Sequence, residues 1–514
     1  MTGEGPLALD LSGRGWERLP EWAGEEPLSG ILARFLPSRR WFGSKSRTIR
    51  TVRPESVLSL PGGGRGRIYL CILRVDYETG EGERYFLPLA RAREGEVPES
   101  GTIARLDPPD GDFTRLADGF FVPETGQELL REILSPAPSR SGLGRVRTAV
   151  LEQRGVTVDP SLVPTVFRGE QSNTSLLFGR RLMFKGFRKL APGMNPDLEA
   201  GVFLARQGGG IPIPATFGAL LAKTPEGDPL VLGILQEFVD NQGDGWSWFL
   251  SRLPAILSGG EGEEALDRMV ERLGRQTARL HRALGGDPSD PDFAPVPFGP
   301  EELSRLSDEI GERLGRLFPA LSRALPHLPS AAEALASSLL SRRGELERFV
   351  SACRSRGAGG MCLRCHGDLH LGQVLVTPDN QVVFLDFEGE PALPLASRRL
   401  RTTPLSDVAG MLRSFHYLAL SAQMETPGLR EAAERWTTEQ SRRYLRAYRA
   451  EIAESPGLLP PPDRAGGILG LCLLRKALYE LAYELDNRPG WAEIPLSGIL
   501  ALIDTPLSQS GWDS

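Results

Sequence analysis

The chain has few cysteines, no long apolar run and no large excess of charge, and each scarcity excludes a class of protein. Five cysteines in 514 residues do not make a disulfide framework, so a reducing cytoplasm is the expected compartment. No apolar run approaches the roughly 18 residues that a membrane helix needs. A net charge of −6 gives no electrostatic reason to expect binding to nucleic acid or to an anionic membrane. The segment Met1–Pro6 lacks a basic stretch followed by an apolar core, so a secretion signal is not expected.

Local composition separates a β-rich first half from a helical second half. Apolar residues make up 40% and charged residues 25%, as in ordinary soluble globular proteins. Residues 128–155 have a helical pattern and residues 163–185 are β-rich. From residue 263 onward, apolar side chains recur at helical spacing. The order predicts an α+β fold in three parts, 1–125, 126–240 and a mainly helical 241–514.

Polar residues suited to phosphoryl transfer gather in two short segments, His366–Gln373 and Phe384–Glu390. Phosphoryl transfer needs a carboxylate at the acceptor hydroxyl, metal ions on the donor phosphates and a cation near the α- and β-phosphates. Asp368 supplies a carboxylate in the first segment, and Asp386 supplies one in the second. Together the segments predict a kinase of the aminoglycoside and choline type, which acts on a small molecule.

A β-hairpin explains how the two segments meet. Residues 374–376 and 382–385 have strand character, and the turn-forming residues Thr377–Asn380 lie between them. Such a hairpin places Gln373 at its start beside Asp386 at its end. Both offer oxygen atoms, which Mg²⁺ prefers as ligands.

Two cysteines before the first segment raise an alternative. Cys362, Cys365 and His366 match the pattern for covalent haem attachment. The cytosolic context and the use of His366 in the kinase motif exclude that interpretation. A zinc site would need a second pair of ligands, which His370 alone does not supply. We expect His366 and His370 to bond to backbone or carboxylate groups and so to hold Asp368.

The chain has no Gly-rich nucleotide loop of the common types, and a polar turn, Gly169–Ser175, is the candidate replacement. Its backbone N–H groups and the side chains of Ser172, Asn173 and Ser175 would cradle phosphates. Lys185 ends the next strand, and Glu199 lies where a helix is expected; a strand lysine paired with a helix glutamate holds the α- and β-phosphates in kinases. Taken alone, Lys185 would be a solvated surface lysine. The predicted adenine site comprises Gln236 and Phe238, acting through the backbone.

A late helix carries the candidate acceptor site. Lys476, Tyr479, Glu480 and Tyr483 recur at three- and four-residue spacing and share one helix face. Aromatic and charged groups on one face suit a sugar, although a helix that packs its tyrosines inward has the same spacing. Substrate binding is also assigned to His370. Arg413 either contacts phosphate or sugar, or pairs with a carboxylate.

These segments resemble the maltokinase family along most of the chain. The resemblance is carried by residues 40–45, 170–175, 192–199, 243–246, 366–390, 404–415 and 476–491. It implies a bilobal kinase-like fold in which residues 1–125 are an N-terminal cap, 126–240 the nucleotide-binding lobe and 241–514 the catalytic and sugar-binding lobe. It also implies ATP-dependent phosphorylation of maltose to maltose 1-phosphate, feeding glycogen or α-glucan synthesis. A cytoplasmic monomer with a functional link to trehalose synthase is expected.

The resemblance also implies roles for single residues. Asp368 would be the base, Gln373 and Asp386 would be Mg²⁺ ligands with Glu388 as a further one, and Asp407 would brace the catalytic loop. Two alternatives stay open. One is a kinase for another sugar such as glucosamine, and the other is a kinase-like binding protein without catalysis.

Overall fold

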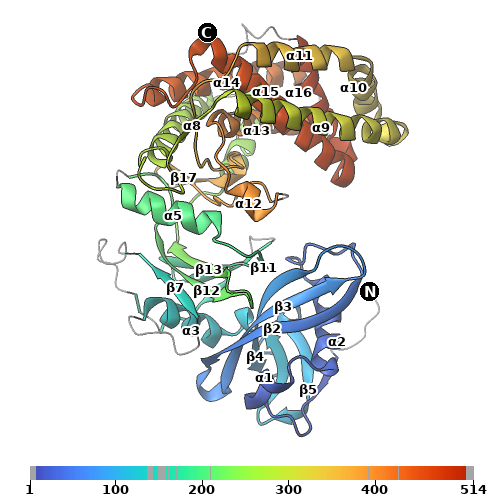
Figure 1. The fold of residues 1–514 in the computed structure, drawn as a ribbon, viewed down its shortest axis with the longest axis vertical. Helices are drawn as coiled ribbons and strands as arrows, with labels where there is room; N and C mark the ends of the chain where they lie inside the picture. Colours follow the sequence, from blue (N-terminus) through green and yellow to red (C-terminus); the bar gives the residue numbers. More distant parts are fainter. Residues whose placement is uncertain are drawn as a thin grey trace. The chain divides into compact units, whose positions relative to one another are not determined.

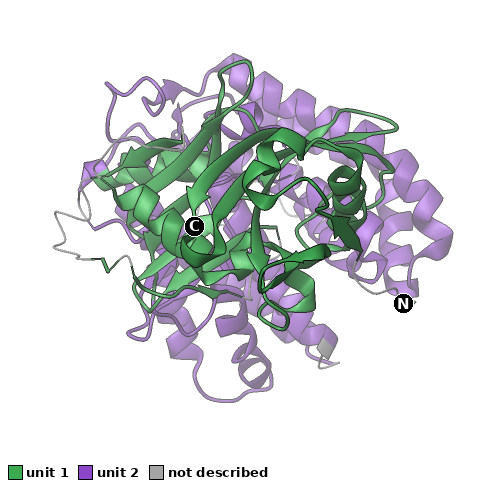
Figure 2. Cartoon of the chain, turned by 90° about the horizontal axis from the view of Figure 1, so that it is seen from below, with its two compact units in different colours: residues 1–205, 214–239 green, residues 206–213, 240–514 purple. Residues whose placement is uncertain are grey.

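The protein forms two compact units. The computed structural model describes residues 7–135, 143–148, 158–159, 161–167, 172–208, 210–391, 393–425 and 428–504. Unit 1 comprises residues 1–205 and 214–239, and unit 2 comprises 206–213 and 240–514 (Figure 2). Sheets dominate unit 1 and helices dominate unit 2 (Figure 1), so the α+β order is confirmed. The division into 1–125, 126–240 and 241–514 stays a prediction.

The first sheet of unit 1 is sandwiched between two cores. Its order is β1-β5-β6-β4-β3-β2, with β11 paired to β4, and only β1 and β5 run parallel among the pairs recorded. Along β3, Ile68 and Leu70 belong to one core while Tyr69 and Cys71 belong to the other, because successive strand residues face opposite sides. The strands are β1 Ala8–Asp10, β2 Ile49–Pro61, β3 Arg67–Tyr77, β4 Glu83–Ala92, β5 Thr102–Asp110, β6 Phe113–Asp118 and β11 Lys189–Leu190.

Helices α1 (Leu19–Trp22) and α2 (Glu26–Phe35) contribute side chains to the core that contains Tyr69 and Cys71. The other core continues into the second sheet, whose order is β7-β12-β13-β10-β9-β8. Its strands are β7 Gly144–Arg147, β8 Thr165–Val166, β9 Thr174–Phe178, β10 Leu182–Gly186, β12 Thr216–Lys223 and β13 Pro229–Glu237. Helix α3 (Pro123–Leu134) packs against β7 and β12, and helix α5 (Pro196–Gln207) contributes Leu198 to the same core.

The helical prediction for residues 128–155 is wrong in part. Helix α3 ends at Leu134, and residues 144–147 form strand β7. Residues 149–157 lie outside the described residues. Strand β7 pairs with β12, where a Cβ on Gly218 would lie 2.8 Å from the carbonyl oxygen of Val146. The glycine permits this close backbone approach, a tertiary contact that periodicity does not reveal.

Unit 2 is a helical assembly with two short ladders. Helix α8 packs along α14, and α13 packs against both α14 and α15. The helices are α6 Gly245–Leu250, α7 Leu253–Leu257, α8 Glu263–Leu284, α9 Pro300–Ala324, α10 Ser330–Ser341, α11 Arg343–Ser355, α12 Leu395–Arg398, α13 Leu405–Glu425, α14 Arg430–Ile452, α15 Pro462–Asn487 and α16 Glu493–Asp504. Single 3₁₀ turns occur at residues 16–18, 36–38, 63–65, 99–101, 119–121, 325–327, 371–373 and 489–491.

The predicted hairpin is confirmed. Strands β16 (Val374–Val376) and β17 (Val382–Phe384) pair antiparallel. A second ladder joins β14 (Val296–Pro297) to β15 (Met361–Cys362), which the sequence did not indicate.

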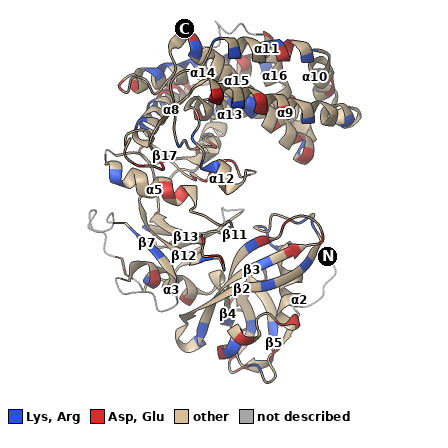
Figure 3. Cartoon of the chain, in the orientation of Figure 1, with Lys and Arg blue, Asp and Glu red and all other residues tan. Residues whose placement is uncertain are grey.

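Charge and hydropathy agree with the composition. Both signs of charge lie along the same elements, as on α5 in Figure 3. Within the described ranges, no helix is both long and apolar enough to cross a membrane.

Candidate active site

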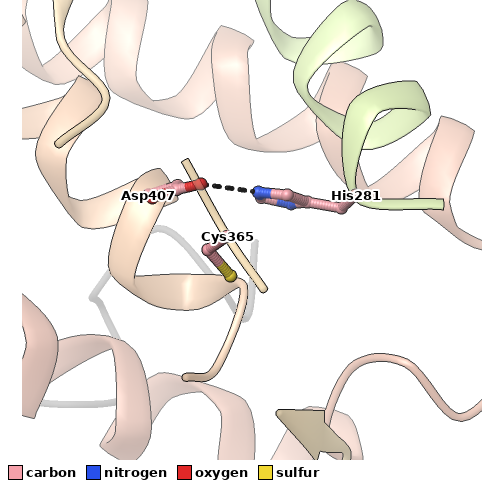
Figure 4. Close-up of side chains that lie close together, drawn as sticks. All are labelled: His281, Cys365 and Asp407. Atoms are coloured by element: carbon pink, nitrogen blue, oxygen red, sulfur yellow. Dashed lines mark hydrogen bonds and ion pairs between the residues drawn. The ribbon is translucent and has the colours of Figure 1, made fainter. Parts of the chain in front are cut away.

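A buried aspartate on α13 holds the backbone of the loop that carries Asp368. The carboxylate of Asp407 accepts hydrogen bonds from the backbone N–H groups of His366 (2.8 Å) and Gly367 (2.9 Å). His281 on α8 lies 3.1 Å from the same carboxylate through Nε2 (Figure 4). Its Nδ1 lies 2.8 Å from the hydroxyl of Tyr448. Burial alone would raise the pKa of Asp407, but the bond to His281 and the other donors outweigh burial and lower it. The bracing role implied for Asp407 is confirmed.

Cys365 completes a close group with His281 and Asp407, and the three ligand atoms lie within 4.8 Å of one another. Both imidazole nitrogens and both carboxylate oxygens already have partners. Burial raises the pKa of the Cys365 thiol well above its usual value, which opposes the thiolate that a metal needs. The group is therefore a support for the loop. His366 bonds through Nε2 to the carbonyl of Leu385 (2.7 Å), which agrees with the rejection of a haem site.

Asp368 is paired with a lysine from α15. Lys476 Nζ donates a hydrogen bond of 2.7 Å to Asp368 Oδ1. Burial raises the pKa of Asp368, but the charge of Lys476 and its hydrogen bond, together with the neighbouring histidines, produce a net lowering. His370 accepts a bond from the N–H of Gly372 (3.0 Å) and so caps the turn that leads to Gln373. Burial lowers the pKa of His370, which favours the neutral ring.

The hairpin brings Gln373 and Asp386 to the same end. Leu385 donates its N–H to the carbonyl of Gln373 (2.9 Å), and Val374 pairs with Phe384 in the ladder. Asp386 has a φ of 58°, a left-handed conformation that few residues other than glycine adopt. Such conformations cost free energy and gather at functional sites. The carbonyl of Glu388 accepts from Arg398 (3.4 Å), which ties this segment to α12.

A cavity of about 530 Å³ opens beside Asp368, within the range typical of small-molecule sites. Of the residues predicted to bind substrate, all but Arg413 line this cavity, together with Asp368: His370, Lys476, Tyr479, Glu480 and Tyr483. The cavity is also lined by residues that were not predicted to bind substrate: Trp246, Pro391, Tyr417, Glu484, Arg488 and Trp491. Some of them belong to the quoted motifs or lie one helical turn from a predicted residue.

Each carboxylate that lines this cavity has a cationic partner. Asp368 pairs with Lys476, as described. Arg413 lies 2.7 Å from Glu480, so of its two predicted roles the structure records the pairing with a carboxylate. Arg488 lies 2.7 Å from Glu484. Burial raises the pKa of Glu484 despite this cation.

The lysine predicted to bind nucleotide is buried in unit 1, and one of its partners lies at the start of α5. Lys185 on β10 lies 3.2 Å from Asp197 on α5. Asn195 accepts from the N–H of Asp197 (2.8 Å) immediately before the helix, so the helix begins with Pro196 and Asp197 in its first turn. The predicted pairing of Lys185 with Glu199 stays a prediction. The alternative of a solvated surface lysine is wrong for Lys185.

The remaining nucleotide candidates lie along the second sheet. Gly169–Gln171 lie outside the described residues; Ser172 is exposed, Asn173 is half-buried and Ser175 is buried on β9 opposite Lys185. Gln236 lies on β13 between β10 and β12. The backbone N–H of Phe238 donates a hydrogen bond to the carbonyl of Arg181 (2.9 Å). The adenine role of Gln236 and Phe238 stays a prediction.

Comparison with known proteins agrees with this geometry. Residues 164–389 match the phosphotransferase enzyme family, and residues 35–120 match the maltokinase N-terminal cap domain. A glucosamine kinase of Streptacidiphilus jiangxiensis is 26% identical over 377 residues, which are 70% of this chain and 80% of that protein. A glucosamine kinase of Mycolicibacterium smegmatis is 26% identical over 407 residues, which are 78% and 93% of the two chains.

Solved structures share the fold. A glucosamine kinase in complex with glucosamine, ADP and inorganic phosphate superimposes with a TM-score of 0.62 at 20% identity, covering 92% of this chain and 98% of that chain. Another crystal form of glucosamine kinase superimposes with a TM-score of 0.65 at 20% identity, covering 92% of this chain and 99% of that chain. The α+β, bilobal, kinase-like fold is thereby confirmed.

Proposed function

We propose that this chain, a sugar kinase with a phosphotransferase domain behind a maltokinase-type cap, transfers the γ-phosphoryl group of ATP to maltose and forms maltose 1-phosphate. The observation that carries the choice of a neutral sugar is the charge balance of the acceptor cavity. The links to trehalose synthase and to glycogen synthesis, and the monomeric state, stay predictions.

The charge balance favours a neutral acceptor over an amino sugar. A protonated amine gains most from a carboxylate that has no other cation. In the cavity, Asp368, Glu480 and Glu484 are matched by Lys476, Arg413 and Arg488. Binding an ammonium group to one of these three carboxylates would displace its cation or leave one charge without compensation.

The aromatic lining supports a sugar. Trp246, Tyr417, Tyr479, Tyr483 and Trp491 border the cavity. Ring faces of this kind pack against the apolar faces of pyranoses, while the charged groups bind hydroxyls. A disaccharide uses more of such a lining than a single ring does.

In the proposed mechanism, the acceptor hydroxyl lies against Asp368. The carboxylate is ionised because its pKa is lowered, and Lys476 fixes its orientation. Asp368 accepts the hydroxyl proton as the sugar oxygen bonds to the phosphorus atom and the bond to the leaving ADP oxygen breaks. Lys185, held by Asp197, would steady the α- and β-phosphates.

The metal ligands assigned to this reaction fit a hard cation. Gln373 and Asp386, with Glu388, offer the oxygen donors that would hold Mg²⁺, which neutralises phosphate charge when bound. The shared hairpin end and the left-handed Asp386 support this assignment.

A sugar panel tests the proposal. Maltose, maltotriose, glucose and glucosamine are each incubated with ATP and Mg²⁺, and ADP release gives kcat/KM. We expect the highest value for maltose, with a product whose phosphorus couples to the anomeric proton in ³¹P NMR. A preference for glucosamine would replace maltose with an amino sugar. No turnover above the Asp368→Asn background, together with no Mg²⁺-dependent rise in Tm with ATP, would favour a non-catalytic binding protein.

A further inference from the structure

A fully buried arginine joins the two sheets of unit 1. Arg188 lies in the short link between β10 and β11, where the chain passes from the second sheet to the first. Its Nη2 donates to Asp118 Oδ2 (2.6 Å) at the end of β6, and its Nε donates to Thr174 Oγ1 (2.8 Å) at the start of β9. Asp118 is also fully buried, and its Oδ1 accepts from the N–H of Phe120 (3.1 Å). One guanidinium therefore fixes a residue of each sheet.

The surroundings leave Arg188 little freedom. Its guanidinium carbon lies 4.3 Å from the ring centre of Phe120 and 4.6 Å from that of Trp41. Trp41 belongs to the segment 40–45 in the front part of the chain. A Cβ on Gly186 would lie 2.5 Å from the Phe120 ring and 3.1 Å from the carbonyl of Thr174, so the backbone here is closely packed. A buried cation without its carboxylate is costly, and Arg188 therefore depends on Asp118.

Thr174 connects this arginine to the phosphate elements. It directly follows Ser172 and Asn173 in the candidate phosphate turn. The next residue, Ser175, lies opposite Lys185 in the β9–β10 ladder. Arg188 thus holds Thr174, at the described end of this turn, through its side chain, and the strand that precedes Arg188, β10, carries Lys185. These two elements must keep a set separation if they are to bind the same phosphates.

We infer that Asp118 and Arg188 are positioning residues for nucleotide phosphate binding, so that the first sheet holds residues Ser172–Ser175 in place through one buried ion pair. This inference rests on the proposed use of ATP. The acceptor cavity is built from residues of unit 2, so sugar binding is independent of this ion pair.

Nucleotide affinity measured without turnover tests the inference. Asp118→Asn is compared with Asp110→Asn, which removes the carboxylate partner of Arg91 inside the first sheet alone. Isothermal titration with MgADP gives Kd, thermal unfolding gives Tm, and initial rates give KM for maltose. We expect Asp118→Asn to raise Kd for ADP about tenfold and to leave the KM for maltose unchanged. Asp110→Asn should leave Kd unchanged, with a smaller loss of Tm because its side chain is partly exposed.

A second pair of variants keeps the test valid if Asp118→Asn unfolds. Thr174→Val removes the hydroxyl that Arg188 binds and preserves shape, while Thr174→Ser retains the hydroxyl. Valine should raise Kd for ADP and serine should restore it. Wild-type Kd in Thr174→Val and in any folded Asp118→Asn would overturn the positioning role alone. Wild-type protein that binds no ADP would overturn the proposed function and this inference with it.

Discussion

Asp407 and Asp368 are two carboxylates that belong to the same loop assembly and have opposite surroundings. Asp407 is enclosed, and both of its oxygens bond to backbone N–H groups, with a histidine as a further partner. Asp368 borders a cavity, and its recorded side-chain partner is a single lysine. A buried carboxylate whose two oxygens are both hydrogen-bonded stabilises structure, whereas one that faces a cavity is available to a substrate.

Asp407→Ala should cause the largest change, and it should appear in stability. The substitution leaves the N–H groups of His366 and Gly367 and the ring of His281 without their acceptor. Loss of one partner from a buried charged network costs ~3–5 kcal/mol. We expect a matching fall in the free energy of unfolding, measured with urea. A stable variant with normal activity would show that the loop does not need this brace.

Asp368→Asn should produce the converse result. Removal of a catalytic base typically lowers the rate by ~10²–10⁴-fold, while the amide oxygen of the asparagine can still accept the hydrogen bond from Lys476. We expect kcat to fall in that range with little change in Tm. Equal losses of stability in Asp368→Asn and Asp407→Ala would remove the distinction between the two residues.

Gly410→Ala should disturb the loop from the helix side. A Cβ at Gly410 on α13 would lie 2.4 Å from the carbonyl oxygen of Leu369, next to Asp368. The backbone must move, at a cost of ~1–3 kcal/mol, and activity should fall with it. Gly311→Ala on α9 is the matched control, since nothing lies within 4 Å of its Cβ. Alanine there should stabilise the helix by up to ~1 kcal/mol, and a loss in both variants would contradict the steric account.

Lys476→Met should change the pH dependence of the rate. In the wild type, the pKa of Asp368 is below its ordinary value, so this carboxylate stays ionised to a lower pH than an ordinary aspartate does. Without Lys476, burial becomes the dominant influence and raises this pKa, so the acidic limb of kcat should move to higher pH. Lys476→Arg keeps the positive charge and should leave the limb in place. A limb that shifts equally in both variants would point to lost sugar contacts.

Local sequence was sufficient for the elements that form from neighbouring residues. The hairpin at 374–384 follows from two short apolar runs around Thr377–Asn380, and its pairing necessarily brings Gln373 to Asp386. Helix α15 presents Lys476, Tyr479 and Glu480 together because of its own periodicity. These features depend on separations of a few residues.

Contacts between distant segments were less predictable. The ion pair between Lys185 and Asp197 depends on where α5 begins, and strand β7 pairs with β12 beside Gly218, which admits a neighbouring backbone. The joining of two sheets by Arg188 has no local signal, because Asp118 and Thr174 are its partners only in three dimensions.

The sequence by itself determined the α+β order, the phosphotransfer motif and the set of polar residues at the acceptor helix. Motif spacing and side-chain periodicity encode these features directly. The tertiary structure decided which carboxylate is neutralised by which cation, because ion pairing depends on distances of a few ångströms between segments far apart in the chain. That pairing makes Asp407 a brace, gives Asp368 a lysine partner beside an open cavity and supplies a cation for each carboxylate that lines this cavity.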